Sequence, residues 1–228
     1  MLPPRLFLAS VMVLGLAALA GATDRADKPS DKKAVPESRP GWFVVEEDVW
    51  IRLNDEPSQH MHQAHESFLK KAYGATTSEL RKAGGYLHIA ARNSSSETKA
   101  ALTASAHELD SLAAEVQAGT VKSVKSLDSA FARAEHALAA DDHAKAKTAL
   151  KAKHHAMAGH YLRSAMNHVE DAAKWSGHEL ERGTVATANG VRIVAGKLID
   201  GSGFVVDEAE KGVTWVGDEV EKVGKSID

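Results

Sequence analysis

The stretch that decides the fold is residues 61–91, which read MHQAHESFLKKAYGATTSELRKAGGYLHIAA. Small and apolar residues recur in it at steps of three and four, first at Met61, Ala64, Phe68 and Ala72 and then at Leu80, Ala83, Leu87 and Ala90. This spacing lines one face of an α-helix. A break at Tyr73 and Gly74 separates the two stripes, so the sequence predicts two antiparallel helices joined as a hairpin.

Three further helices are expected before residue 178. Residues 94–97 read SSSE and form a capping box, which predicts the start of a helix that Gly119 ends. A regular apolar stripe over residues 124–138 predicts the next helix. Asp141 and Asp142 are expected to cap a fifth helix, which ends near Trp175.

The segment that precedes the hairpin has two interpretations. Residues 42–53 are strongly apolar and fit either a short strand or an irregular helix. The acidic residues and the proline at 55–58 predict the start of the first helix. Aromatic residues make up only 5% of the chain and alanine is abundant, which favours packed helices over sheets. We therefore expect residues 41–177 to form an all-α bundle or short solenoid of two related antiparallel hairpins and a middle helix.

The C-terminal tail, residues 178–228, is rich in valine and glycine. Its apolar spacing predicts an amphipathic helical hairpin, with helices near 184–199 and 206–226 and a turn at 200–203. A β-hairpin that pairs 191–199 with 204–206 is the alternative, because Asp-Gly turns also favour hairpins. Glycines at 196, 203, 217 and 224 fall on multiples of seven, a spacing that allows close contact between helices.

The N-terminal residues predict export. Arg5 precedes an apolar run over residues 6–20, and small residues at Ala20 and Ala22 suit a signal peptidase. The run is shorter than the roughly 20 residues that a membrane anchor needs. We expect residues 1–22 to be a signal peptide cleaved near Ala22, which makes the protein periplasmic or secreted. Residues 23–40 are charged and contain prolines, so they are expected to be a disordered linker.

Two segments of the helical region align at an offset of 70 residues. Ala64, Tyr73, Thr76, Leu80 and Ala83 correspond to Ala134, His143, Ala146, Leu150 and Lys153. The arrangement of small residue, ring and leucine resembles the core of the tetratricopeptide repeat over two hairpins, without that family's tryptophan, Leu-Gly pair or closing proline. The resemblance implies a superhelical surface that binds a protein or peptide partner.

Composition and motifs argue against several functions. The formal net charge is −3 and no basic cluster stands out, so no nucleic-acid partner is expected. The motifs His-Glu-x2-His, Gly-x-Ser-x-Gly and Gly-x-Gly-x2-Gly are all absent, so no enzymatic activity and no organic cofactor are expected. The chain has no cysteine, so its core forms without disulfides.

Twelve histidines are the one compositional feature that suggests chemistry. They are densest at residues 60–66, where His62 lies three residues before His65 and four before Glu66. At this spacing, side chains share a helix face and can bind one metal ion. His62, His65 and Glu66 are therefore the ligands predicted for a metal ion, and imidazole suits zinc, copper or nickel. The alternative is that His65, His154 and His168 are hydrogen-bonded side chains of the core or its edge and that the other histidines face solvent.

Three functions follow from these observations. The first is an exported, non-enzymatic helical protein of the bacterial envelope, which acts as a binding, scaffold or stress-protection module. The second is a periplasmic, histidine-based transition-metal-binding protein. The third is a protein that associates with a membrane surface through residues 184–228.

Overall fold

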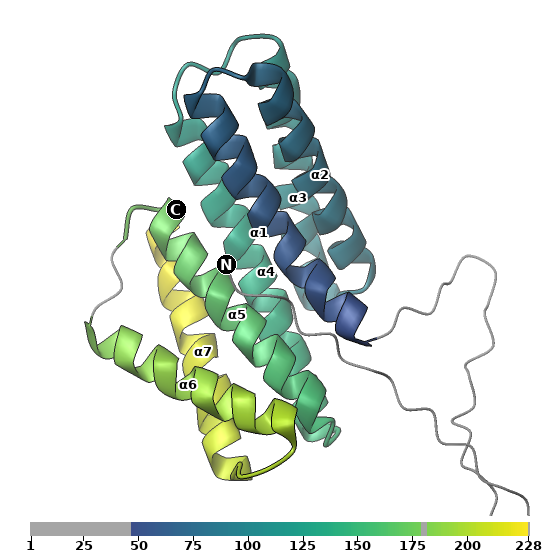
Figure 1. Cartoon of the computed structure of the whole chain (residues 1–228), viewed down its shortest axis with the longest axis vertical. Coiled ribbons are helices and arrows are strands. Elements are labelled where there is room, and N and C mark those ends of the chain that lie inside the picture. Colours follow the sequence, from purple (N-terminus) through teal and green to yellow (C-terminus); the bar gives the residue numbers. More distant parts are fainter. Residues whose placement is uncertain (1–46, 179–181, 228) are drawn as a thin grey trace, which may run out of the picture. The chain divides into compact units, whose positions relative to one another are not determined.

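The computed structural model describes residues 47–178 and 182–227, and every regular element in these ranges is a helix (Figure 1). The helices are α1 (Glu47–Leu69), α2 (Tyr73–Arg92), α3 (Ser96–Gln117), α4 (Lys125–Lys151), α5 (His155–Trp175), α6 (Arg182–Asp200) and α7 (Val206–Ile227). The prediction of an all-α protein is confirmed, and the β-hairpin alternative for the tail is wrong. The expected signal peptide and linker lie outside the described residues.

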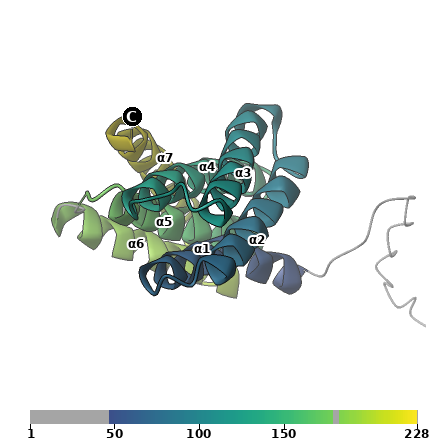
Figure 2. The same ribbon diagram turned by 90° about the horizontal axis from the view of Figure 1, so that it is seen from above.

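The helices enclose two hydrophobic clusters that share α4. The first cluster lies among α1, α2, α3 and the N-terminal half of α4, around Phe131. The second lies among the C-terminal half of α4, α5, α6 and α7, around Leu162 and Met166. In Figure 2, α4 and α5 lie between α2 and α3 on one side and α6 and α7 on the other. The C-terminal hairpin, which the sequence sets apart from residue 178 onward, thus shares a core with α4 and α5.

Helix α4 is longer than the sequence predicts. It runs without a break through Asp141 and Asp142, and the turn comes at residues 152–154, where Lys153 has a φ of 61°. The expectation that the two aspartates cap a fifth helix is wrong. The carboxylate of Asp141 has partners within the fold instead: Thr98 donates a hydrogen bond of 2.6 Å to it, and Lys145 forms a 2.6 Å ion pair with it.

Because α4 extends to Lys151, the two segments that align at an offset of 70 residues do not match in structure. Tyr73 is the first residue of α2, whereas His143 lies in the middle of α4. The two aligned segments therefore occupy different places in their helices, and the second hairpin turns near Lys153.

The start of α1 and the capping of α3 also differ from expectation. Helix α1 begins at Glu47, so Pro57 lies inside the helix and does not mark its first turn. Of the apolar segment, residues 47–53 are helical, and residues 42–46 lie outside the described residues. Helix α3 begins at Ser96 with Ser95 as N-cap, but no side chain caps its amides, so the predicted capping box does not form. Gly119 ends α3 as predicted, with a φ of 71°.

Glycines let the C-terminal helices approach their neighbours. A Cβ atom at Gly159 of α5 would lie only 2.6 Å from the carbonyl oxygen of Ala195 in α6. On α7, Cβ atoms at Gly217 and Gly224 would meet the rings of His143 and His136 at 2.8 and 2.7 Å. The seven-residue spacing thus corresponds to close helix contact at these two positions.

Candidate metal centre

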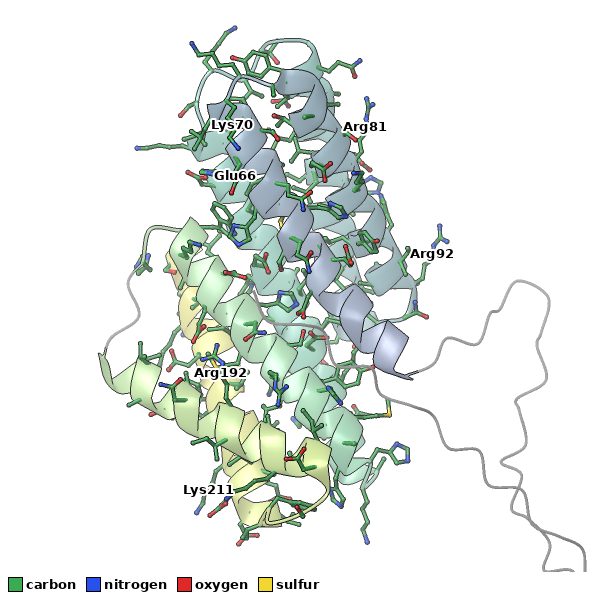
Figure 3. All side chains as sticks on the ribbon, viewed as in Figure 1. Glu66, Lys70, Arg81, Arg92, Arg192 and Lys211 are labelled. Atoms are coloured by element: carbon green, nitrogen blue, oxygen red, sulfur yellow. The ribbon has the colours of Figure 1, made fainter. Side chains whose placement is uncertain are left out.

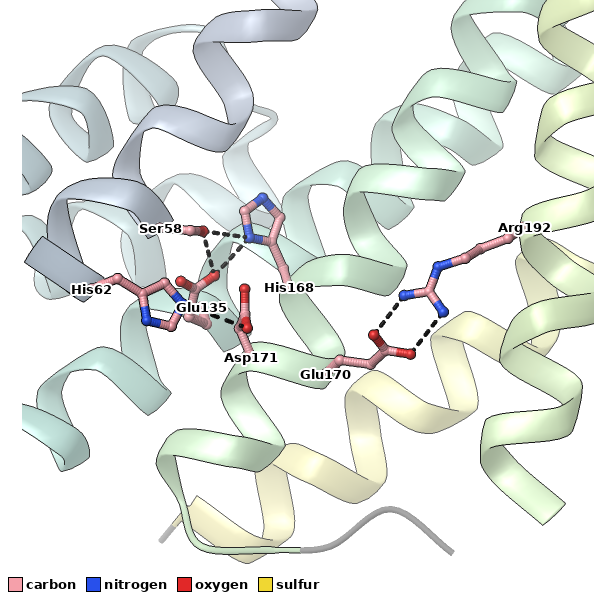
Figure 4. A network of polar contacts seen from close by, with 7 residues as sticks. All are labelled: Ser58, His62, Glu135, His168, Glu170, Asp171 and Arg192. Carbon is pink, nitrogen blue, oxygen red and sulfur yellow. Dashed lines mark hydrogen bonds and ion pairs between the residues drawn. The ribbon is translucent and has the colours of Figure 1, made fainter. Parts of the chain in front are cut away.

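The histidines that the sequence singles out lie on α1, where His62 and His65 both pack against the ring of Trp175, at centroid distances of 4.8 and 5.1 Å. Each ring also faces a carboxylate. His62 Nε2 lies 3.8 Å from Asp171 Oδ1. Figure 4 draws this contact as a dashed line. His65 Nε2 lies 3.2 Å from Asp128 Oδ1, and burial raises the pKa of Asp128. The two rings share an indole neighbour but face carboxylates on different helices.

Glu66, the third predicted ligand, points to solvent. Its side chain is 70% exposed and forms an ion pair of 3.3 Å with Lys70, four residues later and just past the end of α1 (Figure 3). Within the described residues, His62, His65 and Glu66 are not among the groups that offer three ligand atoms within 4.8 Å of one another. Their assignment to one metal ion stays a prediction.

A different cluster, on α2 and α3, does offer three ligand atoms within 4.8 Å of one another. His88 of α2 lies beside His107 and Asp110 of α3, and one ligand atom from each of the three lies within 4.8 Å of the others. His88 Nε2 is 3.2 Å from Asp110 Oδ2. The two imidazole rings meet edge to face, with centroids 5.1 Å apart and an interplanar angle of 76°.

The pairing of α2 with α3 brings these residues together. On α3, His107 and Asp110 are three residues apart, so they lie on one side of the helix beside its buried apolar stripe. His88 is on the neighbouring helix, 19 residues before His107 in the sequence. Spacing within one helix does not predict this set, because its members stand on two helices, although the three-residue spacing of His107 and Asp110 is a local signal for two of them.

The contact between His88 and Asp110, which has the length of a hydrogen bond, also suits one edge of a tetrahedral metal centre. Bonds of about 2.0–2.1 Å to nitrogen and oxygen place two ligands of a tetrahedral ion about 3.3 Å apart. The 3.2 Å between His88 and Asp110 is close to that edge. Two imidazoles and one carboxylate are a donor set that zinc, nickel and copper accept. Because the side chains of His88 and Asp110 are 33% and 44% exposed, an ion held by them would keep a coordination position open to solvent.

The chain also holds a second histidine–carboxylate network, which is buried (Figure 4). Glu135 of α4 accepts hydrogen bonds from His168 Nδ1 of α5, at 2.6 Å, and from Ser58 of α1, at 3.1 Å. Glu135 and His168 are 0% and 1% exposed. Burial alone would lower the pKa of His168, but the hydrogen bond and negative charge of Glu135, with smaller contributions from Asp142 and Asp55, raise it to about 9.

A second carboxyl group faces the same ring. Asp142 Oδ2 lies 3.7 Å from His168 Nε2, and burial raises the pKa of Asp142 against the influence of the imidazolium. His168 thus carries its proton between Glu135 and Asp142, out of reach of solvent. This network of buried polar side chains ties α1, α4 and α5 together.

Comparison with known proteins found no match: no family model, curated protein or solved structure matches the chain.

Proposed function

We propose that this protein is an exported, non-enzymatic binding protein whose ligand is a transition-metal ion held by His88, His107 and Asp110. The observation that carries the proposal is the convergence of three donor atoms within 4.8 Å from two adjacent helices. Zinc, nickel and copper are the ions that match two imidazoles and a carboxylate.

The surroundings of the cluster support reversible binding. His107 is exposed and His88 is only partly buried, so an ion can enter from solvent without a change in the fold. All three ligands stand on helices that pack closely on each other, and rigid elements hold ligands more accurately than loops do. With only three protein ligands, the ion would exchange with solvent, which suits a protein that buffers or carries metal.

The test is a metal titration of the purified protein and of two triple alanine variants. One variant replaces the three proposed ligands, and the matched control replaces His62, His65 and Glu66 on α1. We expect isothermal titration calorimetry to show one zinc, nickel or copper ion per wild-type chain, none in the first variant, and wild-type binding in the control. Binding that survives the first variant and is lost in the second would assign the metal to α1.

A thermal melt gives an independent readout. An ion that binds only the folded chain stabilises it by about 2.7 kcal/mol at a hundredfold excess over the dissociation constant. The melting temperature of the metal-free protein should therefore rise in a saturable way with the metal. If no metal shifts the melt or gives heat on titration, the proposed function is wrong.

Binding of a partner or a membrane surface through the C-terminal helices is a second candidate. Apolar side chains are exposed on α6 and at the start of α7, with Ile193 62%, Val205 53% and Val206 46% accessible. No helix within the described ranges is long and apolar enough to cross a bilayer. Flotation with anionic liposomes, compared between the protein and its Ile193→Ser/Val205→Ser variant, tests this candidate. Equal flotation of both would exclude a role for these side chains in membrane contact.

A further inference from the structure

We infer that Gly84 is a positioning residue of the metal site, because the carboxylate of Asp110 occupies the space that a side chain at residue 84 would need. The inference rests on the proposed metal function. It explains why the three donors can meet at the interface between α2 and α3, and it assigns a role to a residue that has no side chain of its own.

The geometry at this point is tight. Gly84 is buried on α2, one turn before His88. A Cβ atom at Gly84 would lie 3.0 Å from Asp110 Oδ1 and 3.3 Å from the carbonyl oxygen of Ala106. The other carboxylate oxygen, Oδ2, faces His88 Nε2 at 3.2 Å. One oxygen of Asp110 therefore packs over the glycine while the other reaches the imidazole.

A methyl group at residue 84 would displace the ligand before it displaces the helices. The side chain of Asp110 is 44% exposed, so it can rotate toward solvent. The carbonyl oxygen of Ala106 would have to yield by only a few tenths of an ångström. Gly84→Ala should therefore remove the carboxylate from the cluster and leave His88 and His107 in place.

The neighbouring residue supplies a matched control. A Cβ atom at Gly85 would meet nothing within 4 Å, so Gly85→Ala makes the same chemical change on the same helix without touching Asp110. Both substitutions favour the helix, because alanine has a higher helix propensity than glycine. A general effect on the stability of α2 would therefore appear in both variants.

The experiment measures zinc affinity by calorimetry for the wild type, Gly84→Ala, Gly85→Ala, Asp110→Ala and the Gly84→Ala/Asp110→Ala double variant. We expect Gly84→Ala to weaken zinc binding about 10- to 100-fold, the range seen when a residue that orients a ligand is lost. Gly85→Ala should bind as the wild type does. The double variant should bind as Asp110→Ala does, because Gly84 acts only through that carboxylate.

A spectroscopic signature separates positioning from a purely structural role. The visible spectrum of bound Co²⁺ depends on its ligands, so Gly84→Ala should give the spectrum of Asp110→Ala and not that of the wild type. Zinc binding by Gly84→Ala equal to that of the wild type would overturn the inference while leaving the site intact. A further loss in the double variant beyond Asp110→Ala would also overturn it. Absence of zinc binding by the wild type would instead refute the proposed function itself.

Discussion

The buried pair of His168 and Glu135 predicts that the protein loses stability above neutral pH. The ordinary pKa of histidine is 6.5, and that of His168 is about 9 in the folded protein. Each pH unit of difference corresponds to about 1.4 kcal/mol, so the charged imidazole contributes on the order of 3 kcal/mol to the free energy of unfolding. Because the folded state holds the proton more tightly, this contribution is complete below pH 6.5 and disappears as the pH rises through 9.

Urea unfolding at pH 6.5 and at pH 9.5 measures this loss. We expect the wild type to lose about 3 kcal/mol more than His168→Gln over this interval, because the variant has no proton to release there. His107→Gln is the matched control: it removes an exposed histidine and should keep the pH dependence of the wild type. Glu135→Gln should cost about 3–5 kcal/mol at pH 6.5, the usual effect of leaving a buried charge without its partner.

A direct titration by NMR covers the case in which a variant fails to fold. The ring nitrogens of His168 in the wild type should titrate near pH 9, well above those of an exposed histidine. Titration of His168 near its ordinary value of 6.5 would refute this reasoning. So would an equal loss of stability in the wild type and in His168→Gln.

Three further substitutions test the packing and the surface. Gly159→Ala should destabilise the protein by about 1–3 kcal/mol, because its Cβ would lie 2.6 Å from the carbonyl oxygen of Ala195. Gly190→Ala is the control: its Cβ would meet nothing within 4 Å, so the change should be neutral or stabilise the protein by up to about 1 kcal/mol. Equal unfolding free energies for both variants would contradict the close approach of α5 and α6. Lys70→Ala should change the free energy of unfolding by about 0.5 kcal/mol or less, because its ion pair with Glu66 is exposed. A larger loss in chemical denaturation would contradict this account of the ion pair.

Much of the fold follows from local sequence pattern. The apolar stripes predict the helices because a period of 3.6 residues is a property of each segment by itself. The predicted helix ends fail where a polar residue has a distant partner. Asp141 reads as a cap in sequence, but its hydrogen bond comes from Thr98, 43 residues earlier. No local pattern contains that contact, so the length of α4 could not be predicted.

The candidate site also depends on contacts between distant residues that no local pattern contains. His62, His65 and Glu66 attract attention because they share one helix, yet Glu66 points to solvent and the two rings face carboxylates on other helices. The cluster that the structure forms needs the register between α2 and α3, which brings His88 to Asp110. That register depends on packing between two helices, so it cannot be predicted from the local sequence pattern.

The most direct test of the central claim is a crystal structure of the protein grown with zinc, with anomalous data collected at the zinc absorption edge. We predict one strong anomalous peak bonded to a nitrogen of His88, a nitrogen of His107 and an oxygen of Asp110, at about 2.0–2.2 Å from each. Zinc bound at another site, with no peak between α2 and α3, would contradict the account.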